Sequence, residues 1–153
     1  MYNRPEELDE LLASILIQEY DEVFDVYIIE DGSSVKSDLI VEKYRTELSI
    51  HYFEKENTGP GLSRNFGMQK ATGNYFIILD SDVILPKHYL ATVAKQLEHK
   101  YTDAFGGPDA AHPNFSVLQK AINYSMTSFF TTGGIRGKKS SVGKFQPRSF
   151  NMG

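Results

Sequence analysis

The sequence contains no cysteine, so it can form no disulfide and has no thiolate to bind a metal or to act as a nucleophile. It also lacks any run that approaches the ~20 apolar residues of a transmembrane helix, and no signal peptide is visible. What is present is ordinary for a globular protein, since 41% of the 153 residues are hydrophobic and 24% are charged. This length predicts about one domain with a core of its own.

Acidic and basic residues are unevenly distributed along the chain. Residues 1–130 hold 11 Lys and Arg and all 20 acids, a net charge of −9, whereas residues 131–153 hold five bases and no acid. The acidic body argues against a general nucleic-acid-binding protein. We expect one folded domain over 1–130, followed by a flexible basic loop over 131–153. That loop is either simply solvated, or closes over a diphosphate, or meets anionic lipid headgroups.

Hydrophobic periodicity predicts alternating helices and strands. Apolar residues at 8, 11, 12, 15 and 16 have the spacing of an amphipathic helix, and Pro5 suits its first turn. Strands are predicted over 24–29, 50–53, 75–79 and 104–106, and further helices over 37–48, 62–71, 86–98 and 115–128. Repeated βαβ units require right-handed crossovers, so the predicted fold is α/β, with a mostly parallel sheet flanked by helices.

Two carboxylates follow the most apolar of these predicted strands. Asp80 and Asp82 come directly after 75–79, with Ser81 between them. Hard oxygen ligands in this arrangement suit Mg²⁺ or Mn²⁺, which proteins bind through one or two carboxylates and the oxygens of a substrate phosphate. A turn that ends a buried strand explains the same residues without a metal, because Asp is common in turns. From this motif alone both interpretations are open.

A second predicted strand also ends in acids. The strand at 24–29 is followed by Glu30, Asp31 and Gly32. Ligands of open α/β sheets bind at the carboxyl ends of the strands, so two acidic strand ends indicate a single site. A carboxylate here could accept a hydrogen bond from a base N–H or a ribose hydroxyl. Taken alone, the residues fit equally a turn in which a serine caps the next helix.

A glycine-rich segment at 56–67 supplies a third candidate element. Gly59 and Gly61 allow the backbone to approach a ligand closely, and the predicted helix after them offers N–H groups to an anion. Arg64, near the start of that helix, could bind a phosphate or a carboxylate at a neighbouring strand end. A plain loop with a solvated arginine is the alternative. The spacing matches neither a P-loop nor a dinucleotide-binding fingerprint.

The segment after 104–106 offers a less distinctive candidate. Asp109 could face the same cleft and contact a second substrate, although turn chemistry explains it more simply. His112 is expected to be a loop residue, because the histidines of the chain show no metal-binding spacing. The apolar stripe of the helix at 115–128 is expected to pack in a core, with a membrane-surface face as the alternative.

Together these segments resemble the inverting family 2 glycosyltransferases, which have a GT-A fold. Tyr2-Asn3-Arg4-Pro5 is similar to the opening that follows the first strand of the family, and 28–33 matches its acidic second strand end. Residues 57–67 match its N-x-G-x-x-x-[AS]-R-N-x-G signature, and 80–82 match its D-x-D element. Each motif is modest, but their order and spacing make the resemblance specific over nearly the whole chain.

The resemblance implies a metal-dependent transfer of a sugar from a nucleotide sugar, most often linked to UDP, to an acceptor hydroxyl. It implies that Asp31 contacts the base, framed by Tyr2 and Arg64. Asp80 would hold the ribose or the metal, and Asp82 would bind Mn²⁺ or Mg²⁺ beside the donor diphosphate. The further donor-binding residues implied are Glu30, Asn57, Gly59 and Ser81. The 1–130 domain would then bind the donor, and 131–153 would lead into the acceptor side.

The resemblance also implies a glycan or lipid-linked acceptor and a role in bacterial polysaccharide synthesis at the inner face of the cytoplasmic membrane. Relative to the family pattern, the strand before Tyr2 is missing, as is the region that usually carries the catalytic base. We therefore expect this chain to be a fragment, with the catalytic base outside it. Asp109 is the candidate within the chain for contact with the acceptor. The main alternative is a non-catalytic nucleotide-binding module of the same fold. A receiver-like domain that takes up acyl phosphate at Asp80 fits the 57–67 signature less well.

Overall fold

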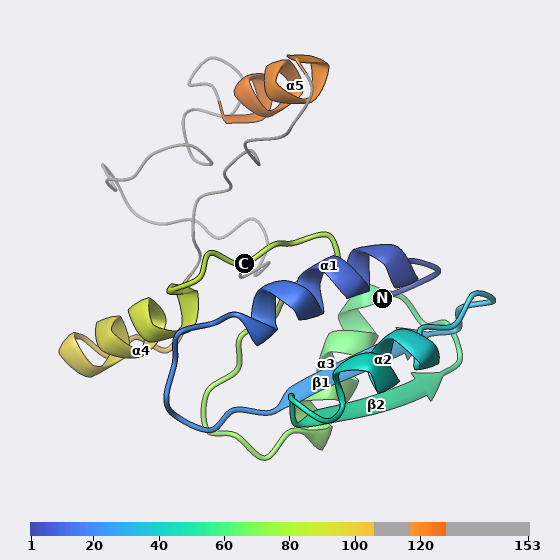
Figure 1. Cartoon of the computed structure of the whole chain (residues 1–153), viewed down its shortest axis with the longest axis horizontal. Coiled ribbons are helices and arrows are strands. Elements are labelled where there is room, and N and C mark those ends of the chain that lie inside the picture. The colour runs from blue at the N-terminus through green and yellow to red at the C-terminus, as the bar shows by residue number, and fades with distance from the viewer. Residues whose placement is uncertain (106–116, 128–153) are drawn as a thin grey trace. The chain divides into compact units, whose positions relative to one another are not determined.

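The computed structural model of the chain describes residues 1–105 and 117–127 (Figure 1). The chain divides into two compact units, Met1–Asp103 and Ala104–Gly153, which are described separately. The first unit is described throughout. Its elements in chain order are α1 (Pro5–Leu16), β1 (Val26–Asp31), α2 (Asp38–Tyr44), β2 (Ile50–Lys55), α3 (Pro60–Lys70) and α4 (Tyr89–His99).

The two strands β1 and β2 form a parallel ladder. Val26 lies opposite Ile50 at its start and Asp31 opposite Lys55 at its end. The predicted α/β architecture with parallel strands is thereby confirmed. Because side chains alternate along a strand, residues opposite each other in the ladder share a face of the sheet, and their sequence neighbours point to the other face.

The hydrophobic core lies on the face of the sheet that carries Ile28 and Ile50. Four of the five residues of the predicted stripe of α1 are buried there, with Leu12 fully inaccessible to solvent, and the fifth, Leu16, is partly buried. Burying one such side chain contributes roughly 2 kcal/mol, so most of the stability of α1 comes from this stripe. The buried apolar residues of the core are Leu8, Leu11, Leu12, Ile15, Ile28, Val41, Tyr44, Leu48, Ile50 and Leu85.

Helix α3 packs on the opposite face of the sheet. A Cβ at Gly67 would lie only 3.2 Å from Cγ1 of Ile29, so glycine allows the helix to approach β1 closely. Phe66 meets Phe53 of β2 edge to face, with ring centroids 5.9 Å apart. This packing brings the start of α3 to the carboxyl ends of both strands, where the sequence places its acidic residues (Figure 1).

Several element boundaries differ from those predicted. β1 starts at Val26 instead of 24 and runs on through Asp31, and β2 continues to Lys55 instead of ending at 53. α2 covers only Asp38–Tyr44 of the predicted 37–48. α4 begins three residues later than predicted, because the carbonyl of Pro86 first accepts the N–H of Tyr89 in a turn.

The predicted strand over 75–79 is not formed, which corrects the sequence interpretation of its apolar run. A strand needs a hydrogen-bonded neighbour, and in the described residues the edge of β1 that faces away from β2 pairs with Met1 instead. The Met1 amino group donates to the Ile29 carbonyl at 2.7 Å, and the Asp31 N–H donates to the Met1 carbonyl at 2.9 Å. The segment is only partly buried, with Phe76 40% exposed.

In the second unit, helix α5 covers Val117–Thr127, inside the predicted 115–128. Ala104 and Phe105 are not in a strand, contrary to the prediction for 104–106, whose last residue lies outside the described residues. Asp109, His112 and the basic 131–153 segment also lie outside them. None of the helices in the described parts of the chain is long and apolar enough to cross a membrane.

Candidate functional site

The carboxyl ends of β1 and β2 meet the start of α3 at one edge of the sheet. Asp31 is the last residue of β1, and Lys55, the last residue of β2, lies opposite it. The loop from Lys55 to α3 passes over the end of β1 and reaches the helix at Gly59, whose φ of 87° favours glycine. The structure thus assembles two of the three sequence segments that we singled out.

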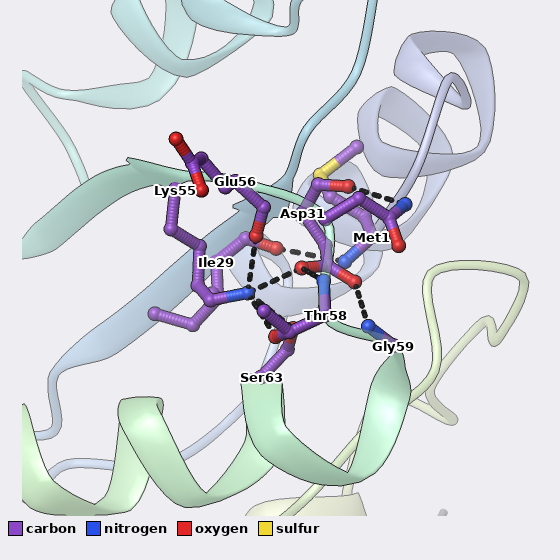
Figure 2. A network of polar contacts seen from close by, with 9 residues as sticks. Met1, Ile29, Asp31, Lys55, Glu56, Thr58, Gly59 and Ser63 are labelled. Carbon is purple, nitrogen blue, oxygen red and sulfur yellow. Dashed lines mark hydrogen bonds and ion pairs between the residues drawn. The ribbon is translucent and has the colours of Figure 1, made fainter.

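Asp31 is a buried carboxylate surrounded by hydrogen-bond donors (Figure 2). Its Oδ1 accepts the N–H of Thr58 at 3.0 Å and the ammonium of Lys55, and its Oδ2 accepts the N–H of Gly59 at 2.8 Å. Burial by itself raises the pKa of Asp31. These hydrogen bonds, together with the nearby hydroxyl of Ser63, outweigh burial and lower the pKa to about 2. Asp31 is therefore an anion at neutral pH and acts only as an acceptor.

The ammonium of Lys55 joins Asp31 to the loop that leads into α3. It donates to the Thr58 hydroxyl at 2.5 Å, to the Glu56 carbonyl at 2.7 Å and to the Ser63 hydroxyl at 3.3 Å, in addition to Asp31 (Figure 2). Only 16% of the Lys55 side chain is exposed. Sequence reasoning missed this residue, because it ended the second strand two residues early and so did not place Lys55 opposite Asp31.

The loop lies close to the end of β1 because of two residues. The side-chain amide of Asn57 donates to the Asp31 carbonyl at 2.9 Å. Gly32 has a φ of 74°, and a Cβ there would lie 2.7 Å from the Asn57 nitrogen. A side chain at position 32 would therefore collide with the loop. Asn57 thus holds the loop to the backbone of Asp31, and Gly59 donates its N–H to the Asp31 carboxylate.

Arg64 and the acidic turn after 75–79 lie beside this group. The Arg64 guanidinium donates to Oδ1 of Asp80 at 2.6 Å. The pKa of the Met1 amino group is lowered, mainly by burial; the negative charges of Glu30, Asp31 and Asp80 oppose this shift, and the positive charge of Arg64 adds to it.

The other residues of the 80–82 turn face the start of α1. The Ser81 hydroxyl is 3.4 Å from a Glu7 carboxylate oxygen, and Asp82 lies 3.9 Å from Arg4, which also pairs with Glu7 at 2.9 Å. The Asp82 side chain is 60% exposed, so solvent and ligands can reach it. Within the described residues no three carboxylate or histidine side chains gather as a preformed metal site.

The segment before α1 is held by Asn3, which sequence reasoning also missed. Its Oδ1 accepts the N–H groups of Ser34 at 2.8 Å and Val35 at 2.9 Å, and its own N–H donates to the Ser33 hydroxyl at 2.8 Å. Asn3 has a φ of 53°, a conformation that Asn tolerates better than most residues. It fixes the adjacent Tyr2, which is 51% exposed, beside the β1–α2 loop.

Glu30 is the one predicted residue of the first strand end that the structure does not bring to this group. It points to the opposite face of the sheet from Asp31 and is only 2% exposed. Its Oε2 accepts the Ser37 N–H at 3.0 Å and the Tyr52 hydroxyl at 2.5 Å. Burial and this hydrogen bond raise the pKa of Tyr52. Glu30 thus stabilises the start of α2 from inside the core.

These features define an α/β domain with an anionic acceptor, an arginine and an exposed acidic turn at the carboxyl ends of parallel strands, where such sheets bind ligands. The family model of Glycosyl transferase family 2 matches residues 1–150. The chain belongs to glycosyl transferase family 2.

Relatives and solved structures agree with this assignment. An uncharacterized glycosyltransferase of Rickettsia felis is 35% identical over 98 residues, covering 64% of this chain and 16% of the relative. The poly(ribitol-phosphate) beta-N-acetylglucosaminyltransferase TarS of Staphylococcus aureus is 31% identical over 105 residues, covering 67% of this chain and 18% of TarS. The matched region therefore spans less than a fifth of the length of these two relatives.

The crystal structures of TarS 1–349 bound to UDP and to UDP-GlcNAc are similar to this chain in fold. Each has a TM-score of 0.69 and 28% identity over 76% of this chain, which corresponds to 36% and 34% of the respective TarS chains. These values show that this chain shares the fold of TarS 1–349.

Proposed function

We propose that this chain is the donor-binding part of an inverting, metal-dependent glycosyltransferase that uses a UDP-sugar. The observation that carries the proposal is the buried, ionised Asp31 at the carboxyl end of β1, held by three donors beside Arg64 and Asp80. An anion that can only accept hydrogen bonds suits the imide N–H of uracil. The UDP-GlcNAc complex of the similar TarS structure supports the choice of donor.

In this proposal some residues of the site contact the donor and others hold the loop beside it. Asp31 accepts the base N–H, and the exposed ring of Tyr2 stacks against the base. Asn57 and Gly59 hold the loop that closes around Asp31. Asp80, fixed by Arg64, accepts a ribose hydroxyl, while Arg64 and Ser81 lie on the side of the diphosphate.

Asp82 and Asp80 fit a divalent cation that is bound together with the donor. Both offer hard oxygen ligands, and Asp82 is 60% exposed. Mg²⁺ and Mn²⁺ sites commonly combine one or two carboxylates with substrate phosphate oxygens, so the two acids need no third protein ligand. When bound, the cation neutralises negative charge on the departing nucleoside diphosphate. Asp82 would hold it and Asp80 would support it.

The acceptor hydroxyl would attack the anomeric carbon from the face opposite the diphosphate, which inverts the configuration. A carboxylate base would take the proton of that hydroxyl. We assign that base to no residue of this chain, and Asp109, which lies outside the described residues, stays a candidate for contact with the acceptor. We propose a glycan or lipid-linked acceptor and a role in polysaccharide synthesis at the inner face of the cytoplasmic membrane.

Calorimetric titration of UDP in the presence of Mn²⁺ tests the proposal. We expect binding by the chain, its loss in EDTA, and a decrease of at least about tenfold in affinity for Asp82→Ala, because the variant lacks the exposed metal ligand. Asp21→Ala is the matched control, since this exposed aspartate lies in the loop before β1. Absence of metal-dependent UDP binding in the unaltered chain would contradict the proposal.

A further inference from the structure

We propose that Lys55 determines base specificity. It occupies an acceptor position on Oδ1 of Asp31, which leaves Oδ2 as the oxygen that can accept a hydrogen bond from the base. This inference rests on the proposed function and assigns a role to a residue that the sequence motifs do not include. The site would then take a base with one N–H donor, such as uracil, in preference to a base with two parallel donors, such as guanine.

The argument starts from the lone pairs of the Asp31 carboxylate. An ionised carboxylate has about four positions that accept hydrogen bonds, two on each oxygen. Lys55 and the N–H of Thr58 fill both positions on Oδ1. The N–H of Gly59 fills one position on Oδ2. These three hydrogen bonds leave one acceptor position, on Oδ2, and 7% of the Asp31 side chain is exposed. The Ser63 hydroxyl, which also lowers the pKa of Asp31, lies 3.3 Å from the Lys55 ammonium.

The hydrogen bond of Lys55 to Oδ1 of Asp31 is largely buried and is supported by further contacts. The same ammonium is held by the Thr58 hydroxyl, the Glu56 carbonyl and the Ser63 hydroxyl, which come from the loop and from α3 (Figure 2). The side chain is 16% exposed, so a ligand cannot displace it without breaking all of these bonds. By contrast, both side chains of the Lys36–Glu54 ion pair, on the other face of the sheet, are about half exposed.

The consequence for the base follows from hydrogen-bond chemistry. Uracil presents one imide N–H between two carbonyls, which matches one free acceptor position. Guanine presents two parallel N–H donors, which would need both oxygens of the carboxylate. With Oδ1 already filled, one guanine donor would be buried without a partner, which lowers affinity by roughly tenfold to a hundredfold.

The test compares UDP with GDP, both with Mn²⁺, by calorimetry on the full chain and on three variants. The diphosphate is the same in both ligands, so the ratio of the two dissociation constants reports the base. We expect the unaltered chain to prefer UDP by at least about tenfold. Lys55→Met should reduce this preference by about tenfold, because it frees one position on Oδ1 for the second guanine donor.

Two further variants separate specificity from general damage. Lys55→Arg keeps a cationic donor toward Oδ1 and should retain the preference for UDP. Lys36→Met, the matched control, removes an exposed ion pair of the same type and should leave the preference unchanged. A folded Lys55→Met variant with an unchanged ratio would overturn the inference while leaving the proposed function intact. If the unaltered chain binds neither nucleotide, both fail together.

A measurement on the unaltered chain covers the case in which Lys55→Met does not fold. The ¹⁵N-labelled ammonium of Lys55 should give an NMR signal protected from exchange with water, since four acceptor atoms lie within hydrogen-bond distance of its three N–H groups. We expect that signal to persist when UDP saturates the site. Release of the Lys55 ammonium into rapid exchange on UDP binding would show that the base displaces it, and would overturn the inference.

Discussion

Asp31 shows how the environment of a single residue sets its chemistry. The carboxylate is almost completely buried, which disfavours its charged form, yet it accepts three hydrogen bonds, one of them from a cation. The balance leaves an anion with a pKa of about 2, compared with 3.8 in the unfolded chain. The folded state therefore binds this proton less tightly than the unfolded state.

This difference predicts a stability change at low pH. A lowered pKa contributes stability that is present above about pH 4 and is lost as pH falls toward 2. The difference of almost two pKa units corresponds to about 2 kcal/mol. Urea denaturation of the unaltered chain and of Asp31→Asn at pH 5 and pH 2 measures it. The unaltered chain should lose about 2 kcal/mol more than the variant, and equal losses would contradict the pKa of Asp31.

Two glycines with similar backbone angles offer a second prediction at this scale. Gly32 and Gly59 have φ values of 74° and 87°, but a Cβ at 32 would collide with Asn57, whereas a Cβ at 59 has no atom within 4 Å. Gly59→Ala should lower the free energy of unfolding by about 1 kcal/mol, from backbone strain alone. Gly32→Ala should cost about 1–3 kcal/mol more. Denaturation of both variants checks this, and equal losses would mean that the Asn57 loop moves away freely.

At the scale of secondary structure, the sequence predicts best what local spacing determines. The stripe of α1 specifies a helix because every third or fourth residue is apolar, and the buried face is the predicted one. The run at 75–79 is equally apolar, but a strand also needs a partner, which local sequence cannot supply. The candidate site shows the same difference between local and non-local information. Asp31 could be predicted from the acids at a strand end, whereas the role of Lys55 depends on the strand register, which places Lys55 opposite Asp31.

Amide hydrogen exchange tests whether residues 76–79 form a strand. The N–H groups of Ile28 and Glu30 point toward β2 in the parallel ladder, whereas residues 76–79 have no ladder partner among the described residues. The amides of 76–79 should therefore exchange by local opening, at least about a hundredfold faster than those of Ile28 and Glu30. Similar protection in the two segments would show that 75–79 forms a strand in solution, as the sequence predicted.

At the scale of the whole molecule, the core and the candidate site belong to the same unit. The buried apolar residues found in the described chain, from Leu8 to Leu85, all lie in Met1–Asp103. The same unit holds Asp31, Lys55, Arg64 and the 80–82 turn. A unit with its own core and its own polar site meets the physical requirements of an independently folding domain.

We therefore predict that a chain ending at Asp103 folds and binds UDP. Its free energy of unfolding in urea should lie within about 1 kcal/mol of that of the full chain, and its affinity for UDP with Mn²⁺ within about threefold. A chain ending at Ile84 is the control, because it lacks the buried Leu85 and should lose about 2–5 kcal/mol. If the chain ending at Asp103 does not fold, residues 104–153 cover part of the core. Retained folding with lost UDP binding would show instead that those residues contribute donor contacts, and would place part of the site outside the α/β unit.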